Sequence, residues 1–193
     1  MFSVANELQG RKVAILAADG VEQVELVEPR RAVEEAGAEV EILSPQSGEI
    51  QAVEGEINPT DTFTVDRSVS EASADEYDAL VLPGGVANPD NTRSDPDSVQ
   101  FIRSFFEQGK PVGAICHAPW TLVEADVLQG RKLTSFPSLQ TDVENAGGEW
   151  VNEEVVTDQG LVTSRDPNDL AAFCEKIVEE FAEGKHEEQK RST

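Results

Sequence analysis

The sequence is poor in basic residues: 15 lysines and arginines stand against 38 aspartates and glutamates, which gives a formal net charge of −23 over 193 residues. Such a surface repels phosphates, so we expect neither nucleic acid nor an anionic membrane as a partner. An acidic excess spread along the whole chain is typical of proteins from salt-accumulating cells, where high ionic strength screens the repulsion. We therefore expect a halophilic protein, with an ordinary acidic protein at lower salt as the alternative.

Long apolar segments are also lacking. No run approaches the roughly 20 residues that a membrane-spanning helix needs, and residues 1–12 are polar, without the apolar stretch of a secretory signal. The two cysteines, Cys116 and Cys174, are too few for a disulfide framework, and they indicate a reducing, cytoplasmic location. Cys174 lies among apolar residues at helical spacing, so we expect it in the core. The chain offers no convincing ligand cluster with zinc-site spacing, so no metal is expected. No cofactor is expected either.

The order of elements can be predicted from short apolar runs and helical periodicity. Buried strands are expected at 12–18, 39–43, 78–82 and 112–115, and helices at 22–36, 94–108, 139–146 and 168–182. This alternation predicts an α/β fold with a mainly parallel sheet between two layers of helices. The length fits one domain over residues 1–193, with its core at about 11–183 and a charged, mobile tail at 184–193.

Unusual residues follow three of the predicted strands. These are the segments 19–25 and 83–93 and the pair Cys116 and His117. Ligands of such folds bind beyond the carboxyl ends of the parallel strands, so we expect the three segments to converge on one crevice.

Cys116 ends the apolar run 112–115 and precedes residues that predict a helix, so it lies at a strand-to-helix junction. Backbone amides and the positive end of the helix dipole favour a thiolate there, and a sharp turn of this kind displays the nucleophile of many hydrolases. The interpretation is a nucleophilic cysteine. A buried structural cysteine is the alternative.

Gly84 and Gly85 follow another predicted strand, and they allow backbone amides to approach a ligand closely. The amides of Gly85 and His117 could together form an oxyanion hole. Phosphate binding is a competing interpretation, but the segment lacks the glycine spacing of a dinucleotide site and the lysine of a P-loop. A plain turn is the simplest alternative.

Three polar side chains could assist the thiol. His117 offers an imidazole as proton acceptor and donor, and Asp90 is the best candidate to orient it as the third member of a triad, although an Asp after Asn-Pro is also ordinary turn chemistry. Glu22 begins a predicted helix, where the dipole favours a carboxylate. If Glu22 reaches Cys116 instead, it can tune the thiolate or hold an oxidised sulfenate or sulfinate. Glu25 would share its helix face.

Four motifs carry a family resemblance: VLPGG at 81–85, GKPVGAICHAP at 109–119, VLQGRKLTSFP at 127–137 and NAGGEWV at 145–151. Together they resemble the PfpI family of intracellular cysteine peptidases and deglycases, whose superfamily includes the parkinsonism-associated deglycase and glyoxalase III-type enzymes. The resemblance runs from about residue 12 to residue 181. It implies a flavodoxin-like three-layer sandwich of the class-I glutamine-amidotransferase type, assembled as a dimer or hexamer.

The resemblance also implies roles for particular residues. Cys116 matches the family nucleophile, His117 its base, Glu22 the acid that hydrogen-bonds the thiol, and Gly85 and His117 the oxyanion amides. In the peptidases a neighbouring subunit supplies a glutamate to the triad. Here Asp90 stands at that position, with one residue inserted, so the carboxylate is shorter and its loop longer.

The leading functional hypothesis is a stress-defence enzyme that acts on methylglyoxal and its early adducts through Cys116. A cysteine peptidase with a Cys-His-Asp triad and a redox-responsive chaperone without turnover are the alternatives. A glutamine amidotransferase is not expected. Its His-x-Glu motif has a counterpart only at His186 in the tail, while residues 164–167, where the motif would fall, contain no histidine.

Overall fold

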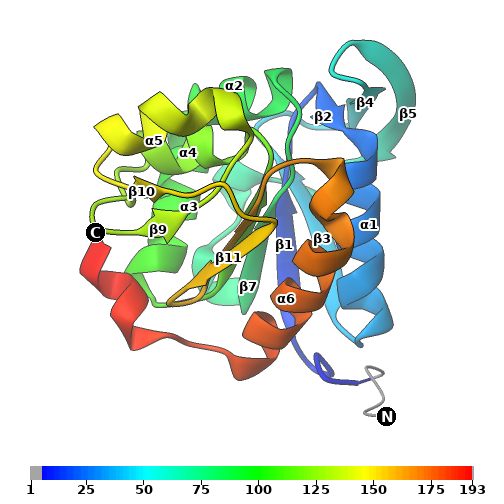
Figure 1. Ribbon diagram of the computed structural model, residues 1–193. Helices are drawn as coiled ribbons and strands as arrows, with labels where there is room; N and C mark the ends of the chain where they lie inside the picture. The colour runs from blue at the N-terminus through cyan, green and yellow to red at the C-terminus, as the bar shows by residue number, and fades with distance from the viewer. Residues whose placement is uncertain (1–5, 193) are drawn as a thin grey trace.

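The computed structural model describes residues 6–192, and its centre is a seven-stranded sheet (Figure 1). The strand order is β11-β12-β8-β7-β1-β3-β6, and every neighbouring pair is parallel except β11 with β12. The strands are β1 (Lys12–Leu16), β3 (Glu39–Ser44), β6 (Arg67–Ser68), β7 (Ala79–Leu82), β8 (Val112–Ile115), β11 (Val155–Asp158) and β12 (Leu161–Ser164).

The central strands are buried on both faces, which explains their continuous apolar sequences. Side chains alternate across a strand, so along β1 Val13 and Ile15 join the apolar cluster on one face while Ala14 and Leu16 join the cluster on the other. A parallel sheet covered on both sides needs apolar residues at every position. The strands predicted at 12–18, 78–82 and 112–115 are of this kind.

Helices cover the two faces of the sheet. Figure 1 shows α1 (Gln23–Glu35) and α6 (Leu170–Glu183) together on one face. The opposite face carries α2 (Ala87–Arg93), α3 (Pro96–Glu107), α4 (Pro119–Glu124) and α5 (Gln140–Asn145). This three-layer arrangement confirms the predicted α/β fold with its mainly parallel sheet.

Smaller elements fill in the periphery. A three-stranded sheet contains β2 (Val21–Glu22), β4 (Glu49–Glu54) and β5 (Asn58–Thr64), and its β4–β5 hairpin projects from the top of the molecule in Figure 1. A second small sheet pairs β9 (Lys132–Leu133) with β10 (Glu149–Trp150). The short 3-10 helices are η1 (Val69–Glu71), η2 (Ala74–Glu76), η3 (Pro137–Leu139), η4 (Pro167–Asp169) and η5 (Glu187–Ser192).

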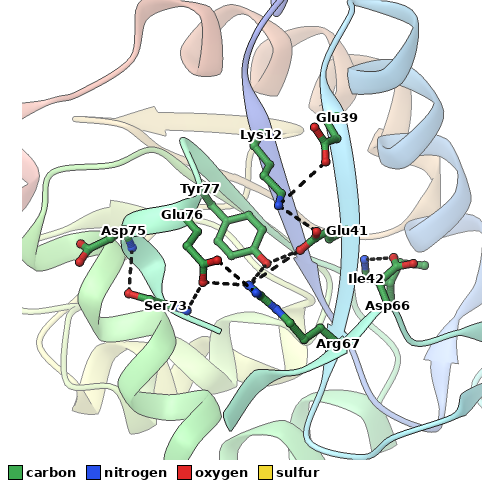
Figure 2. Close-up of polar contacts among 10 residues, drawn as sticks. All are labelled: Lys12, Glu39, Glu41, Ile42, Asp66, Arg67, Ser73, Asp75, Glu76 and Tyr77. Atoms are coloured by element: carbon green, nitrogen blue, oxygen red, sulfur yellow. Dashed lines mark hydrogen bonds and ion pairs between the residues drawn. The ribbon is translucent and has the colours of Figure 1, made fainter. Parts of the chain in front are cut away.

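A polar cluster ties the β3–β6 edge of the sheet to the segment before β7 (Figure 2). Arg67 donates to both carboxylate oxygens of Glu76, at 3.1 and 2.9 Å, and also to the Tyr77 hydroxyl at 2.7 Å. Tyr77 in turn donates to Glu41, which pairs with Lys12 at 2.8 Å. A bidentate arginine–carboxylate pair fixes geometry as well as charge, so the cluster holds the short β6 strand in register.

The residues after α6 fold back onto the body. The His186 amide donates to the Gly109 carbonyl at 2.7 Å, and the fully buried Gln189 donates to the Lys110 carbonyl and accepts from Arg131 at 3.2 Å. Residues 184–192 therefore do not form the mobile tail expected from their charge, because buried hydrogen bonds hold them against the start of β8. Among residues 6–192, no helix is both long and apolar enough to cross a membrane.

Candidate active site

The three segments expected to converge do so. Residues 19–25, Gly84 with Gly85, and Cys116 follow β1, β7 and β8, which are neighbours in the sheet. The contact is close: a Cβ on Gly84 would stand 2.2 Å from Glu25 Oε2 and 2.6 Å from Cys116 Cβ, and one on Gly85 would stand 2.3 Å from the Gly20 carbonyl oxygen. The glycines are required because their backbone fills the place of a side chain.

Cys116 lies on the turn between β8 and α4 with a φ of 63°. A non-glycine residue in this left-handed region is uncommon and costs about 1–3 kcal/mol unless its surroundings enforce it. Here the Cys116 amide donates to the Ser164 carbonyl at 3.1 Å and its carbonyl accepts from the Phe136 amide at 2.8 Å. The predicted strand-to-helix junction is thus present, and it presents the side chain to residues from several elements.

His117 stands directly beside the thiol. Its Nδ1 lies 3.1 Å from Cys116 Sγ, and on the other side of the ring Nε2 lies 3.4 Å from Ser138 Oγ. The ring stacks on Phe136 with centroids 4.5 Å apart. Burial lowers the pKa of His117, so the imidazole is neutral at neutral pH. With Nε2–H donating to Ser138, the lone pair of Nδ1 faces the thiol.

Cys116 as a whole residue is 2% exposed. Burial raises the pKa of Cys116, and the charges of Glu25 and Glu56 raise it further. Hydrogen bonds from the backbone amides of Gly85 and His117 act in the opposite sense and favour the thiolate. The resting cysteine is therefore a protonated thiol, with a base at Nδ1 and two amides within reach of the sulfur.

Glu25 in the first turn of α1 is the carboxyl that packs against the thiol. It is fully buried, and among residues 6–192 neither of its oxygens has a hydrogen-bond partner of ordinary geometry. Burial raises the pKa of Glu25 to about 8, the neighbouring Cys116 thiol opposes this rise, and the nearby Glu22 carboxylate adds to it. Glu25 is thus mainly a neutral acid at pH 7.

Glu22 is not in the expected place. Its carboxylate accepts hydrogen bonds from the backbone amides of Gly55 at 2.9 Å and Glu56 at 3.1 Å. The reason is local: Glu22 pairs with β4 as part of β2, one residue before α1 begins, so its side chain points to the β4–β5 hairpin. The contact predicted between Glu22 and the thiol is replaced by one from Glu25, three residues further on.

Asp90 is also outside the immediate site. It lies in α2 and forms an ion pair with Arg93, whose Nη2 is 2.7 Å from Asp90 Oδ1. In the part of the chain that the structure describes, the side-chain neighbours of His117 Nε2 and Nδ1 are Ser138, Cys116 and Glu56. Asp90 is therefore not a triad member within one subunit, and its role across subunits stays a prediction.

Glu56, which the sequence did not single out, takes a place beside His117. Its Oε1 lies 3.9 Å from His117 Nδ1, and its Oε2 accepts a hydrogen bond from the Val86 amide at 2.7 Å. It stands at the tip of the β4–β5 hairpin, distant in sequence from every residue it meets. The polar and turn residues of 48–65 suggest short strands or a hairpin, but such a pattern does not indicate which residues the tip of the hairpin will contact.

Two groups of side chains among the described residues could hold a metal ion by geometry. One is Glu56, Cys116 and His117, and the other is Glu180, Glu183 and His186. In the second group His186 lies 3.3 Å from Glu180 and is anchored at Gly109, before β8 begins. Cys116 follows the opposite end of β8, so His186 cannot pair with it as an amidotransferase histidine would.

Comparison with known proteins agrees with this geometry. Residues 11–180 match the DJ-1/PfpI family. The chain belongs to the DJ-1/PfpI family. Deglycase TK1284 of Thermococcus kodakarensis is 46% identical over 167 residues, 86% of this chain and 97% of the relative. The putative cysteine protease YraA of Bacillus subtilis is 38% identical over 84% of this chain and 94% of its own length. The crystal structure of Drosophila melanogaster DJ-1beta superposes with a TM-score of 0.80 at 27% identity, covering 94% of both chains.

Membership of the DJ-1/PfpI family confirms the resemblance drawn from the four motifs, and the flavodoxin-like sandwich that it implied. The match to the family model ends at residue 180, before the docked segment 184–192. The second cysteine of this DJ-1/PfpI chain, Cys174, is half-buried in α6 and packs against the apolar cluster beneath that helix, as expected of a structural residue.

Proposed function

We propose that this chain is a cysteine-dependent enzyme of the deglycase and glyoxalase III type, which converts methylglyoxal and its early adducts to lactate. One observation carries the proposal: the Cys116 thiol lies on a strained turn, 3.1 Å from a neutral imidazole nitrogen and beside two backbone amides. The deglycase name of a relative at 46% identity points the same way.

The first step is nucleophilic attack. Cys116 transfers its proton to His117 Nδ1 as the sulfur forms a bond with the aldehyde carbon, C1, of methylglyoxal. The carbonyl electron pair moves onto the C1 oxygen, which the amides of Gly85 and His117 stabilise as an oxyanion. With an early adduct of an amine or a thiol, the new C–S bond forms as the bond from C1 to that amine or thiol breaks, and the group leaves with the proton that His117 Nδ1 took from Cys116. The product is a hemithioacetal on Cys116.

The second stage is an internal oxidation and reduction. The C1 hydrogen leaves as a proton and C2 gains one, so C1 is oxidised to a thioester while the C2 ketone is reduced to an alcohol. Water then hydrolyses the lactyl thioester to lactate and frees the thiol. No external oxidant or reductant enters the balance.

The test is lactate formation from methylglyoxal without glutathione, at high salt, by the wild type and by Cys116→Ala. We expect Cys116→Ala to lose activity by at least about 100-fold, since it removes the group that forms the covalent bond. Cys174→Ala is the matched control and should retain activity. Equal lactate formation by wild type and Cys116→Ala would refute the mechanism.

A cysteine peptidase is the second candidate, favoured by the name of a relative at 38% identity. It uses the same thiol, but it needs an acid for the amine leaving group. Asp90 could supply that acid only from a neighbouring subunit, and the proposal therefore includes a dimer or hexamer. Peptide hydrolysis that Asp90→Asn abolishes, in an oligomer of defined size, would support this candidate.

A redox-responsive chaperone is the third candidate, since a neutral Glu25 could hydrogen-bond an oxidised Cys116. Suppression of aggregation that persists in Cys116→Ala without turnover would favour this role. For all three candidates, the acidic composition supports a halophilic protein with neither nucleic acid nor membrane as partner, and the two cysteines support a cytoplasmic location.

A further inference from the structure

Glu56 lies at the tip of the β4–β5 hairpin, and hydrogen bonds hold both its backbone and its side chain at the site. Its backbone adopts a φ of 72°, unfavourable for a glutamate. The Glu22 carboxylate accepts from the amides of both Gly55 and Glu56, which fixes that turn. The Val86 amide, next to Gly85, then fixes Oε2. Two hydrogen bonds thus fix the turn that carries Glu56 and one orients its carboxylate. Its other oxygen, Oε1, faces His117.

The position of Oε1 shows that Glu56 is not the acid that orients the imidazole in a usual catalytic triad. In a triad the acid binds the imidazole nitrogen that faces away from the nucleophile. Here Ser138 occupies that side, at Nε2, whereas Glu56 approaches Nδ1, the nitrogen that also faces Cys116. Ligating atoms of Glu56, Cys116 and His117 all lie within 4.8 Å of one another. Glu56 therefore faces the space in which a carbonyl bound to the sulfur would stand.

The proposed reaction needs a second base near Cys116, which accepts the C1 proton of the hemithioacetal. After the attack His117 Nδ1 carries the thiol proton, so it cannot also accept the C1 proton. Glu25 is a buried neutral acid behind Gly84, and Glu22 is bound to the hairpin amides. The Glu56 side chain is 34% exposed, and among the described residues His117 is its one ion-pair partner.

We propose that Glu56 is a catalytic base of this site, which removes the C1 proton of the hemithioacetal and returns it to C2. This inference rests on the proposed function. As Glu56 Oε1 takes the C1 proton, the C1–H electron pair forms the C1–C2 double bond, and the C2 oxygen takes the proton from His117 Nδ1. The C1 oxygen stays an oxyanion on the amides. It then re-forms its double bond as C2 takes the proton back from Glu56, which leaves a lactyl thioester, a neutral His117 and an ionised Glu56.

The experiment compares wild type, Glu56→Gln and Cys116→Ala in two measurements: lactate formation, and the methylglyoxal adduct on Cys116 detected by mass spectrometry. Glutamine keeps the acceptor oxygen for the Val86 amide, so the fold and the attack should survive while proton transfer fails. We expect Glu56→Gln to form the adduct as wild type does and to lose about 100-fold or more in lactate formation. Cys116→Ala should form neither product.

Glu54→Gln is the matched control, because Glu54 is an exposed glutamate at the end of β4 in the same hairpin. The pH dependence of lactate formation distinguishes a catalytic role of Glu56 from a merely structural one. Burial raises the pKa of Glu56, so wild-type activity should fall at acid pH as this base is protonated. Glu56→Gln should lose this part of the acidic limb and keep only the part that protonation of His117 causes.

The two proposals fail in different ways. Undiminished lactate formation by Glu56→Gln, with wild type active, would overturn the role of Glu56 and leave the proposed function standing. A wild type that forms neither lactate nor adduct would overturn the proposed function itself. Loss of both adduct and lactate in Glu56→Gln, with an unchanged melting temperature, would place Glu56 in the attack and contradict its assignment to proton transfer.

Discussion

Three glutamates lie in or beside the site, and their surroundings give them different roles. Glu22 accepts hydrogen bonds from two backbone amides of the hairpin. Glu56 accepts one at Oε2 and turns Oε1 toward His117. Glu25 is enclosed by Gly84 and Cys116 without a hydrogen-bond partner among residues 6–192. A buried carboxyl of this kind holds its proton. The free energy of unfolding should therefore depend on pH.

Glu25 should make stability depend on pH. Its pKa is about 8 in the fold against a normal value of 4.5, so above pH 4.5 the unfolded chain releases a proton that the folded chain keeps. The contribution is therefore complete below pH 4.5 and is lost as the pH rises to about 8. We expect the free energy of unfolding to fall across this window by up to about 1.4 kcal/mol per pH unit, and Glu25→Gln to remove that slope. Urea denaturation between pH 5 and pH 8.5 measures it.

Glu35→Gln is the control, because Glu35 is an exposed residue of the same helix. An identical slope in wild type and Glu25→Gln would show that Glu25 is already ionised at neutral pH.

The sequence points to Cys116 and His117 at the centre of the site, but it places Glu22 beside the thiol where the structure has Glu25. Cys116 and His117 follow from their place after a buried strand, because that junction is a local feature. The spacing of Glu22 and Glu25 would put both on one face of a helix. Because α1 begins at Gln23, Glu22 lies outside the helix and only Glu25 reaches the thiol. Glu56 was missed because its contacts depend on how a hairpin folds over a distant strand end.

At the scale of elements, the loop after β7 sets the spacing of the site. Gly84 has no positive φ, so an alanine there would suffer no backbone strain, but its Cβ would collide with Glu25 Oε2 at 2.2 Å and with Cys116 Cβ at 2.6 Å. We expect Gly84→Ala to lower the free energy of unfolding by about 1–3 kcal/mol and to displace the thiol from His117. Melting temperature and the rate of Cys116 alkylation would report the two effects.

Gly130→Ala is the comparison, since its Cβ would meet nothing within 4 Å and only its φ of 71° is unfavourable. It should lose a little stability and keep the wild-type alkylation rate at Cys116. A Gly84→Ala protein that matches it in both respects would contradict the close packing described at the site.

The docked segment 184–192 is a second element whose role can be tested. Gln189 is fully buried and donates to the Lys110 carbonyl, so Gln189→Ala leaves that buried carbonyl with one partner fewer. We expect a loss of about 1–3 kcal/mol in the free energy of unfolding, measured by urea denaturation. Lactate formation should persist, because Lys110 precedes β8 while Cys116 follows it. Glu188→Ala, at an exposed neighbour, should change neither quantity, and equal stability of the two variants would show that the segment is not docked.

For the whole molecule, the apolar segments predicted the parallel sheet and its two helix layers, because a strand buried on both faces has a distinctive sequence. The two-residue strands β2, β6, β9 and β10 have no such pattern, and their pairing partners are far along the chain. Likewise, the composition of residues 184–192 predicted a mobile tail. Most of these residues are charged or polar, and nothing in the composition indicates that Gln189 is buried. A local sequence pattern does not predict which short segments pair with partners far along the chain.

The net charge of −23 also belongs to the molecule as a whole. The electrostatic repulsion among like charges is greater in the compact chain than in the expanded one, so it lowers stability when salt is scarce. Added salt shortens the screening distance from about 10 Å at 0.1 M to about 3 Å at 1 M. It weakens exposed pairs such as Arg31 with Glu28 as well, but each of these contributes only about 0–1 kcal/mol. We therefore expect the melting temperature to rise steeply between 0.05 and 1 M KCl and then level off. A flat or falling curve would mean that local ion pairs outweigh the repulsion, and it would contradict a halophilic origin for the acidic composition.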